Sequence, residues 1–237
     1  MKAVLSSIVF IGLCFGQSLP QFDYQEMMMR QMSEPPPPAT PRLTPDATVS
    51  VASLRHHPPD KALSAFERSL KHANAGEWEA AARDLQKAVA TDPGFADAHG
   101  NLAVCYLEMQ NAEAAAVASR RAIELDPSPT TFHVNLAIAL ILLHQRGEAE
   151  IEARKAADLD HNNAKAHYLL GLLLAQRPET RETAAQHLIY AARGVPEAHH
   201  LLAALYRISG DEARAQEELE RYHSAFVVLS KNKHRVN

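Results

Sequence analysis

The chain has 237 residues, with 24 Lys and Arg against 28 Asp and Glu, and a formal net charge of −4. This acidic balance argues against nucleic-acid binding, because a basic surface is needed to replace the counterions of a phosphate backbone. Two cysteines are too few for a disulfide framework, and the chain contains no run of about 18 apolar residues that could span a membrane.

The first residues have the features of a secretory signal peptide. Lys2 provides a positive charge, Ala3–Phe15 form a nearly unbroken apolar run, and the small residue Gly16 follows. This run is too short for a stable membrane-spanning helix. We therefore expect residues 1–16 to be cleaved and the chain to be exported to the periplasm, the cell envelope or the extracellular space. The alternatives are an uncleaved anchor and a lipid anchor on Cys14.

Residues 17–59 differ in composition from the rest of the chain. Eight of the 14 prolines lie between Pro35 and Pro59. Because proline lacks a backbone donor and fixes φ, we expect an extended or disordered leader here. Within it, residues 22–32 contain Met27–Met29. This part is either a short amphipathic helix with an adaptable binding face or a further piece of the disordered leader.

From about Asp60 onward the sequence repeats with a period of 34 residues. The residues related by this offset are His99, His133 and His167; Leu102, Leu136 and Leu170; Ala81, Ala115 and Ala149; and Ala88, Ala122 and Ala156. A dense self-match at one period predicts a solenoid of stacked units. Apolar residues recur three and four positions apart within each unit, which is typical of helices.

Small residues lie where the two helices of each unit are expected to cross, because a short distance between helix axes requires small side chains at the contact. The expected contact pairs are Ala103 with Ala115, Ala137 with Ala149, and Gly171 with Ala184. Ala112, by contrast, is expected to be exposed.

The pattern resembles the tetratricopeptide repeat (TPR) family. In the second unit it consists of His99, Leu102, Ala103, Tyr106, Ala115, Ala122 and Pro127. The resemblance implies an all-α, right-handed solenoid of about five helix-turn-helix repeats over residues 60–230, preceded by the disordered leader. The expected repeats are 60–95, 96–129, 130–163, 164–195 and 196–230, with a basic tail at 231–237.

No motif typical of an enzyme occurs, since the chain lacks a Gly-rich phosphate loop, a nucleophile elbow and a paired-cysteine motif. We therefore expect no catalysis and no cofactor. The repeated histidines His99, His133, His167 and His199 are expected to be packing residues rather than metal ligands. Equivalent helices of neighbouring repeats are no closer than about 8–10 Å, too far apart to share a zinc ion. Cys105 is expected to be a buried apolar side chain.

The resemblance also implies a concave groove lined by the first helices of the repeats. The residues expected to line it are Asn101, Val104, Leu107, Val134, Asn135, Ile138, Ile141, Tyr168 and Leu172. Such an apolar groove suits an amphipathic helix or an extended apolar segment. Alternatively, some of these residues pack between repeats or are covered by the chain's own leader. Lys165 alone does not make the basic clamp with which some TPR domains hold a carboxylate.

Asn101 and Asn135 occupy the same position in successive repeats. They hold either the backbone of a bound peptide or the backbone of a neighbouring repeat. Together these features predict an exported binding module for a protein or peptide partner. One alternative is a self-assembling subunit of an envelope complex, in which the groove is a contact between copies in a homo-oligomer. A remote alternative is an accessory subunit of an enzyme.

Export can be tested by the mass of the protein recovered from its compartment. We expect the chain to begin near Gln17 and to weigh less than the 26.1 kDa of the full sequence. Intact-mass spectrometry of protein from the envelope fraction gives the answer directly. Recovery of a chain that retains Met1 would instead indicate an uncleaved anchor.

Overall fold

The computed structural model describes residues 56–233, with side chains described as far as residue 225. Over this range the chain forms ten α-helices, one short 3-10 helix and no strand. The predicted all-α class is therefore confirmed. The predictions for the signal segment, the leader up to residue 55 and residues 234–237 lie outside the described residues.

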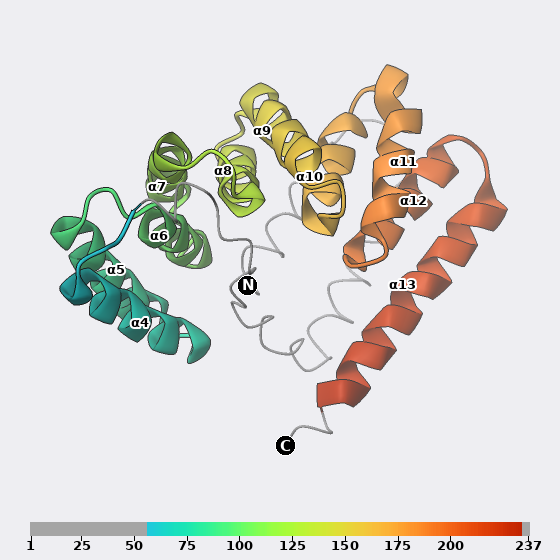
Figure 1. Cartoon of the computed structure of the whole chain (residues 1–237). Helices are drawn as coiled ribbons and strands as arrows, with labels where there is room; N and C mark the ends of the chain where they lie inside the picture. Colours follow the sequence, from blue (N-terminus) through green and yellow to red (C-terminus); the bar gives the residue numbers. More distant parts are fainter. Residues whose placement is uncertain (1–55, 234–237) are drawn as a thin grey trace.

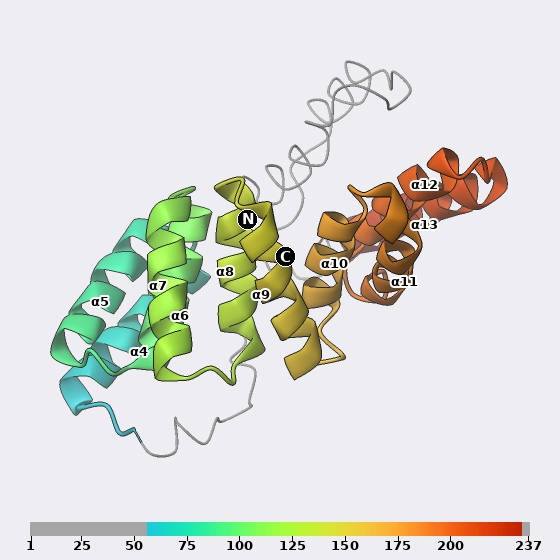
Figure 2. The same ribbon diagram turned by 90° about the horizontal axis from the view of Figure 1, so that it is seen from above.

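The helices pair in chain order. The pairs are α4 (Asp60–Asn74) with α5 (Trp78–Thr91), α6 (Ala96–Glu108) with α7 (Ala112–Leu125), α8 (Thr130–Leu142) with α9 (Arg146–Leu159), α10 (Ala164–Leu174) with α11 (Arg181–Ala191), and α12 (Glu197–Ile208) with α13 (Glu212–Lys233). The pairs follow one another along an arch, with α6, α8 and α10 on its inner side and α7 and α9 on its outer side (Figure 1). Figure 2 shows the same succession from above.

The turn between the two helices has the same backbone geometry in four of the five pairs. The residue in the left-handed region is Gly76, Gln110, His144 or Gly210, with φ between 60° and 81°. In the second pair, the Asn111 amide donates to the Tyr106 carbonyl at 2.8 Å. This is the Schellman arrangement, which satisfies the last carbonyls of a helix. The fourth pair differs because the 3-10 turn Pro178–Thr180 precedes α11.

Small side chains lie at the expected helix crossings. Ala103, Ala115, Ala137, Ala149 and Ala184 are fully buried. The prediction that Ala112 is exposed is wrong, since this residue is also buried. It lies three and four positions before Ala115 and Ala116, and therefore on the same inward face of α7.

Glycines allow two of the closest approaches in the solenoid. A Cβ atom at Gly171 would come within 2.7 Å of the Leu188 Cγ atom, across the crossing of α10 and α11. A Cβ atom at Gly100 would lie 2.1 Å from the Phe132 Cε1 atom. The Phe132 ring therefore lies directly against the backbone of α6, so that α8 packs closely on the preceding repeat.

Two glycine substitutions test this account of the packing. Gly171→Ala inserts a methyl group into a filled contact, and we expect it to destabilise the fold by about 1–3 kcal/mol. Gly147→Ala is the matched control, because a Cβ atom at this helical position meets nothing within 4 Å. It is expected to stabilise the fold by up to about 1 kcal/mol, since alanine restricts the unfolded chain. Chemical denaturation measures both, and a shift of the same sign in the two variants would contradict the assigned packing.

Candidate functional site

The nine residues predicted to line a groove come from the first helices α6, α8 and α10, which contact one another in order. Three of the nine, Asn101, Val104 and Asn135, are half-buried. The other six are only 2–6% exposed: Leu107, Val134, Ile138, Ile141, Tyr168 and Leu172. These six belong to a single apolar cluster. The structure thus brings the predicted residues together as a continuous apolar row along the first helices.

Helix α8 is the centre of this row. Between Phe132 and Ile141, every residue except Asn135 is buried. His133 and Asn135 are the only polar residues of this stretch, and a helix that is so largely apolar is typical of an element with protein on all sides. Helix α8 therefore differs from an ordinary amphipathic helix, whose polar stripe faces water.

Of the two asparagines Asn101 and Asn135, Asn135 is the one that forms a hydrogen bond to the neighbouring repeat. Its Nδ2 atom donates to the Gly100 carbonyl oxygen at 3.5 Å, which links α8 to α6. This is the backbone contact between repeats that the sequence left open as an alternative to peptide binding. Among residues 56–233, no corresponding bond from Asn101 to α4 is present.

Two ionisable groups that the sequence analysis did not select also lie on first helices, Asp97 on α6 and His200 on α12. Asp97 is exposed, yet the surrounding protein removes enough solvent to raise its pKa, and the nearby Asp126 carboxyl acts in the same direction. Desolvation lowers the pKa of His200, with Arg207 and His223 adding to the effect. Both shifts favour the neutral form. The surroundings of both side chains therefore disfavour their charged forms. The sequence does not indicate this, because the neighbouring groups are brought together only by folding.

The chemistry open to residues 56–233 depends on whether they contain a metal-binding cluster and on the single described cysteine. Within residues 56–233, no group of three or more His, Cys, Asp or Glu side chains could hold a metal ion. Cys105 is buried, as predicted, and desolvation raises the pKa of its thiol to about 12. A thiol with so high a pKa remains protonated and unreactive at neutral pH. In the same part of the chain, no helix combines the length and the apolar character needed to cross a membrane.

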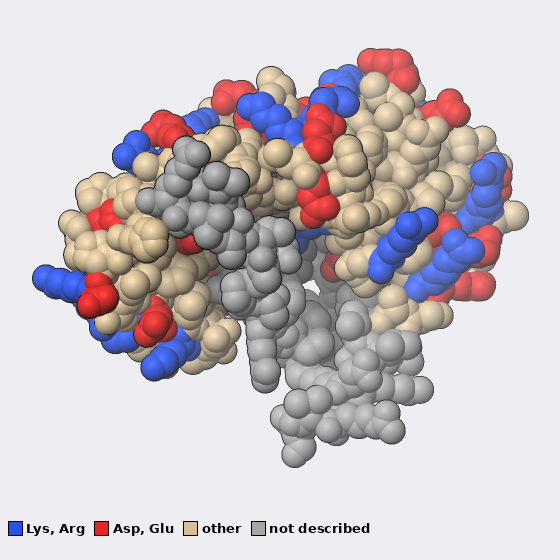
Figure 3. Space-filling model, in the orientation of Figure 1, with Lys and Arg blue, Asp and Glu red and all other residues tan. Residues whose placement is uncertain are grey.

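The outer surface is mixed in character. Val117 of α7 and Ile151 of α9 are 67% and 55% exposed, and they occupy equivalent positions in successive repeats. Around them, positive and negative side chains alternate along the outer side of the arch (Figure 3). One such contact is the pair Arg120–Glu148, whose Nη2 and Oε2 atoms are 3.3 Å apart. Exposed pairs of this kind contribute little to stability, so we interpret this face as ordinary solvated surface.

Comparison with known proteins identifies the class of the fold. The tetratricopeptide repeat family model matches residues 72–118. No curated protein is detectably similar to the chain in sequence. MamA (residues 41 to the end) from Desulfovibrio magneticus RS-1 is 18% identical, with a TM-score of 0.60, over 74% of this chain and 98% of that one. PilF from Pseudomonas aeruginosa is 20% identical, with a TM-score of 0.61, over 70% and 76%.

A third solved structure is YrrB, described as a TPR protein with an unusual peptide-binding site. It is 16% identical, with a TM-score of 0.57, over 78% of this chain and 100% of that one. The described helices are thus a TPR solenoid, as the 34-residue period predicted. Residues 72–118 match the tetratricopeptide repeat family, whose repeats form non-catalytic scaffolds for binding proteins and peptides.

The contact of Asn135 can be tested against its equivalent in the preceding repeat. We expect Asn135→Ala to lower the melting temperature slightly, because a bond at this distance contributes less than about 1 kcal/mol. Asn101→Ala is the control and is expected to change the melting temperature less. Equal shifts in thermal unfolding of the two variants would show that the bond to Gly100 contributes nothing.

Proposed function

We propose that the protein is an exported, non-catalytic scaffold that binds an apolar segment of a protein or peptide partner along α6, α8 and α10. The observation that carries the proposal is the apolar row on these helices, with every α8 residue from Phe132 to Ile141 except Asn135 buried. In a solenoid built of helix pairs, the second helices cover one side of the first helices. Six residues of the row are only 2–6% exposed within the chain itself, so a partner segment would bind by taking the place of whatever part of the chain covers them.

The chemistry of the row indicates the kind of segment that suits it. Val134, Ile138 and Leu172 present aliphatic side chains, and Tyr168 adds an aromatic ring, a residue type favoured at binding hot spots. The half-buried Asn101 and Val104 lie beside them. An amphipathic helix or an extended apolar strand matches such a row, whereas an acidic peptide tail does not, because Lys165 has no second lysine or arginine at the neighbouring groove positions.

Export is supported by the first residues of the sequence. The positive charge of Lys2 and the apolar run of Ala3–Phe15 match the layout of a secretory signal peptide. Removal of residues 1–16 would also remove Cys14 and leave Cys105 as the single cysteine. A chain with one buried thiol cannot form wrong disulfides within itself, which suits an oxidising compartment.

Site-specific photo-crosslinking tests where a partner binds. A benzophenone amino acid is introduced at Val104, on the inner helix α6, or at Val117, on the outer helix α7. The two positions share the same natural residue and lie on adjacent helices, so they form a matched pair. After irradiation of cells that produce the full chain, we expect an adduct heavier than the chain from position 104 and none from position 117.

The mass of the adduct separates the alternatives. An adduct formed only from position 117 would contradict the proposed binding surface. A product of twice the chain mass from position 104 would favour the self-assembling subunit, and a crosslink confined to one chain would favour the leader as the cover. Either result would replace the external partner as the proposed occupant.

A further inference from the structure

The histidine that recurs in the first helices of the second to fifth repeats makes the same hydrogen bond in three successive repeats. The Nε2 atoms of His99, His133 and His167 lie 3.2, 3.1 and 3.0 Å from the carbonyl oxygens of the residues six positions earlier. A carbonyl oxygen only accepts hydrogen bonds, so Nε2 carries the hydrogen in each of these rings. In a neutral ring, Nδ1 is then an acceptor.

The group that faces Nδ1 differs from one repeat to the next. In the third repeat it is the Glu152 carboxylate, with an Nδ1–Oε2 distance of 2.6 Å. The fifth repeat has the equivalent pair, His199 and Glu218, also at 2.6 Å. A carboxylate only accepts, so both ring nitrogens of His133 face acceptors, and a protonated ring can donate to both at once. Burial desolvates Glu152, but its hydrogen bonds with His133 and Lys155 outweigh this and lower its pKa.

The fourth repeat has a second histidine where the third and fifth have a glutamate. The Nδ1 atom of His167, on α10, lies 2.9 Å from the Nδ1 atom of His187, on α11. One hydrogen between these two nitrogens makes a good hydrogen bond, and a single added proton leaves that bond intact. If both rings are protonated, two N–H groups and two positive charges face each other across 2.9 Å.

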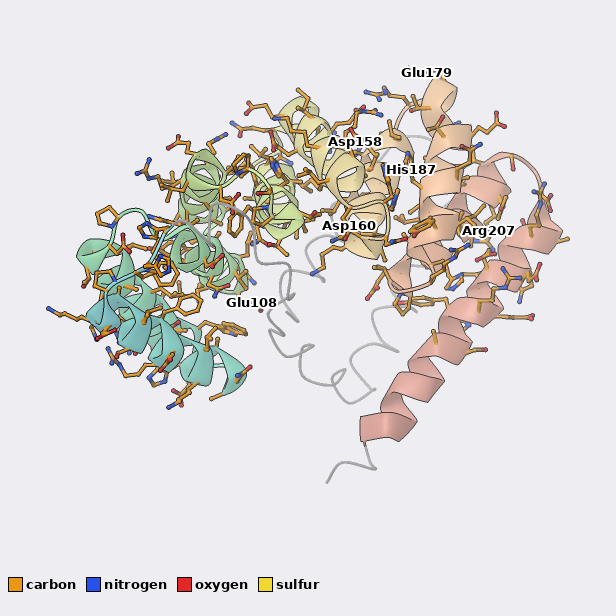
Figure 4. The ribbon with its side chains drawn as sticks, viewed as in Figure 1. Glu108, Asp158, Asp160, Glu179, His187 and Arg207 are labelled. Carbon is orange, nitrogen blue, oxygen red and sulfur yellow. The ribbon has the colours of Figure 1, made fainter. Side chains whose placement is uncertain are left out.

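The surroundings of the pair do not relieve this conflict. Desolvation lowers the pKa of His187, His167 and Arg154 act in the same direction, and only Asp158 opposes them. Asp158 and His187 lie close together where α9, α10 and α11 meet (Figure 4). The His167 ring also packs against Tyr190, with centroids 4.5 Å apart, and the Tyr190 hydroxyl donates to the Asn162 Oδ1 atom at 2.7 Å.

We propose that the α10–α11 pair is an acid-sensitive joint of the solenoid, which loosens when His167 and His187 are both protonated, while the His–Glu pairs keep the third and fifth repeats closed. The second proton binds the folded state more weakly than the unfolded one. The pair without this second proton therefore stabilises the fold fully above the ordinary histidine pKa of about 6.5, and this stabilisation is lost as the pH falls below that value.

The substitution His187→Glu tests the joint because it installs the pair already present in the third and fifth repeats. Thermal and urea unfolding of the full chain are followed from pH 7.5 to pH 5.0. Below about pH 6.5, one excess proton bound on unfolding raises the unfolding constant about tenfold per pH unit. We expect this rise of the unfolding constant in the wild type, and we expect it to be absent from the variant.

Two further variants serve as checks. His187→Gln cannot become charged and is expected to flatten the same pH profile, even if the glutamate variant folds poorly. His161→Gln changes an exposed histidine beside the joint. The backbone carbonyl of His161, not its ring, accepts the hydrogen bond from His167, so this variant is expected to keep the wild-type pH profile.

Hydrogen exchange locates the effect, once corrected for the pH dependence of chemical exchange. At pH 5 we expect the amides of α10 and α11 to lose protection before those of α8 and α9. A wild-type pH profile that persists in both His187 variants would overturn the proposal. Uniform loss of protection along the solenoid would do so as well.

Discussion

The close approach of the two helices within each repeat is the constraint on which the rest of the solenoid depends. Alanine or glycine at the crossing lets the two backbones pack with almost no side chain between them. The large apolar side chains are thereby displaced to the sides of the first helices, where they pack against the neighbouring repeats. The same displacement produces the continuous apolar row on α6, α8 and α10. Packing within a repeat and the candidate binding surface therefore have one cause.

Much of this fold could be predicted from sequence because the crossing residues recur at a fixed spacing. Ala103 and Ala137, with their partners, mark both the helices and their register. The inter-helix turns were less visible, since Gln110 and His144 adopt a conformation that the sequence signals by glycine only at Gly76 and Gly210. Tertiary context holds these two residues in the left-handed region, so local propensity gives no indication of them.

The placement of the nine predicted residues on the first helices could be predicted from the sequence, but the environment of each side chain could not. The helical period identified which residues share the first-helix face, yet it carried no information on how deeply each is buried. The histidine pairs show the same limit more sharply. His133 and Glu152 are 19 positions apart, and His167 and His187 are 20 apart. The 34-residue period identifies each histidine as a repeat position. Its partner lies on the second helix of the repeat, and only the packing of the two helices shows which residue that is.

The apolar interior consists of two clusters, and this division affects how the protein unfolds. One cluster draws its members from α4 to α7, the other extends from Leu107 to Leu205, and the two share no buried residue. Tyr106 packs against both. In a linear array each repeat contacts only its neighbours, so cooperativity depends on such links. The melting of this chain is therefore governed by two coupled units, and the enthalpy measured by calorimetry should exceed the van't Hoff enthalpy of its transition.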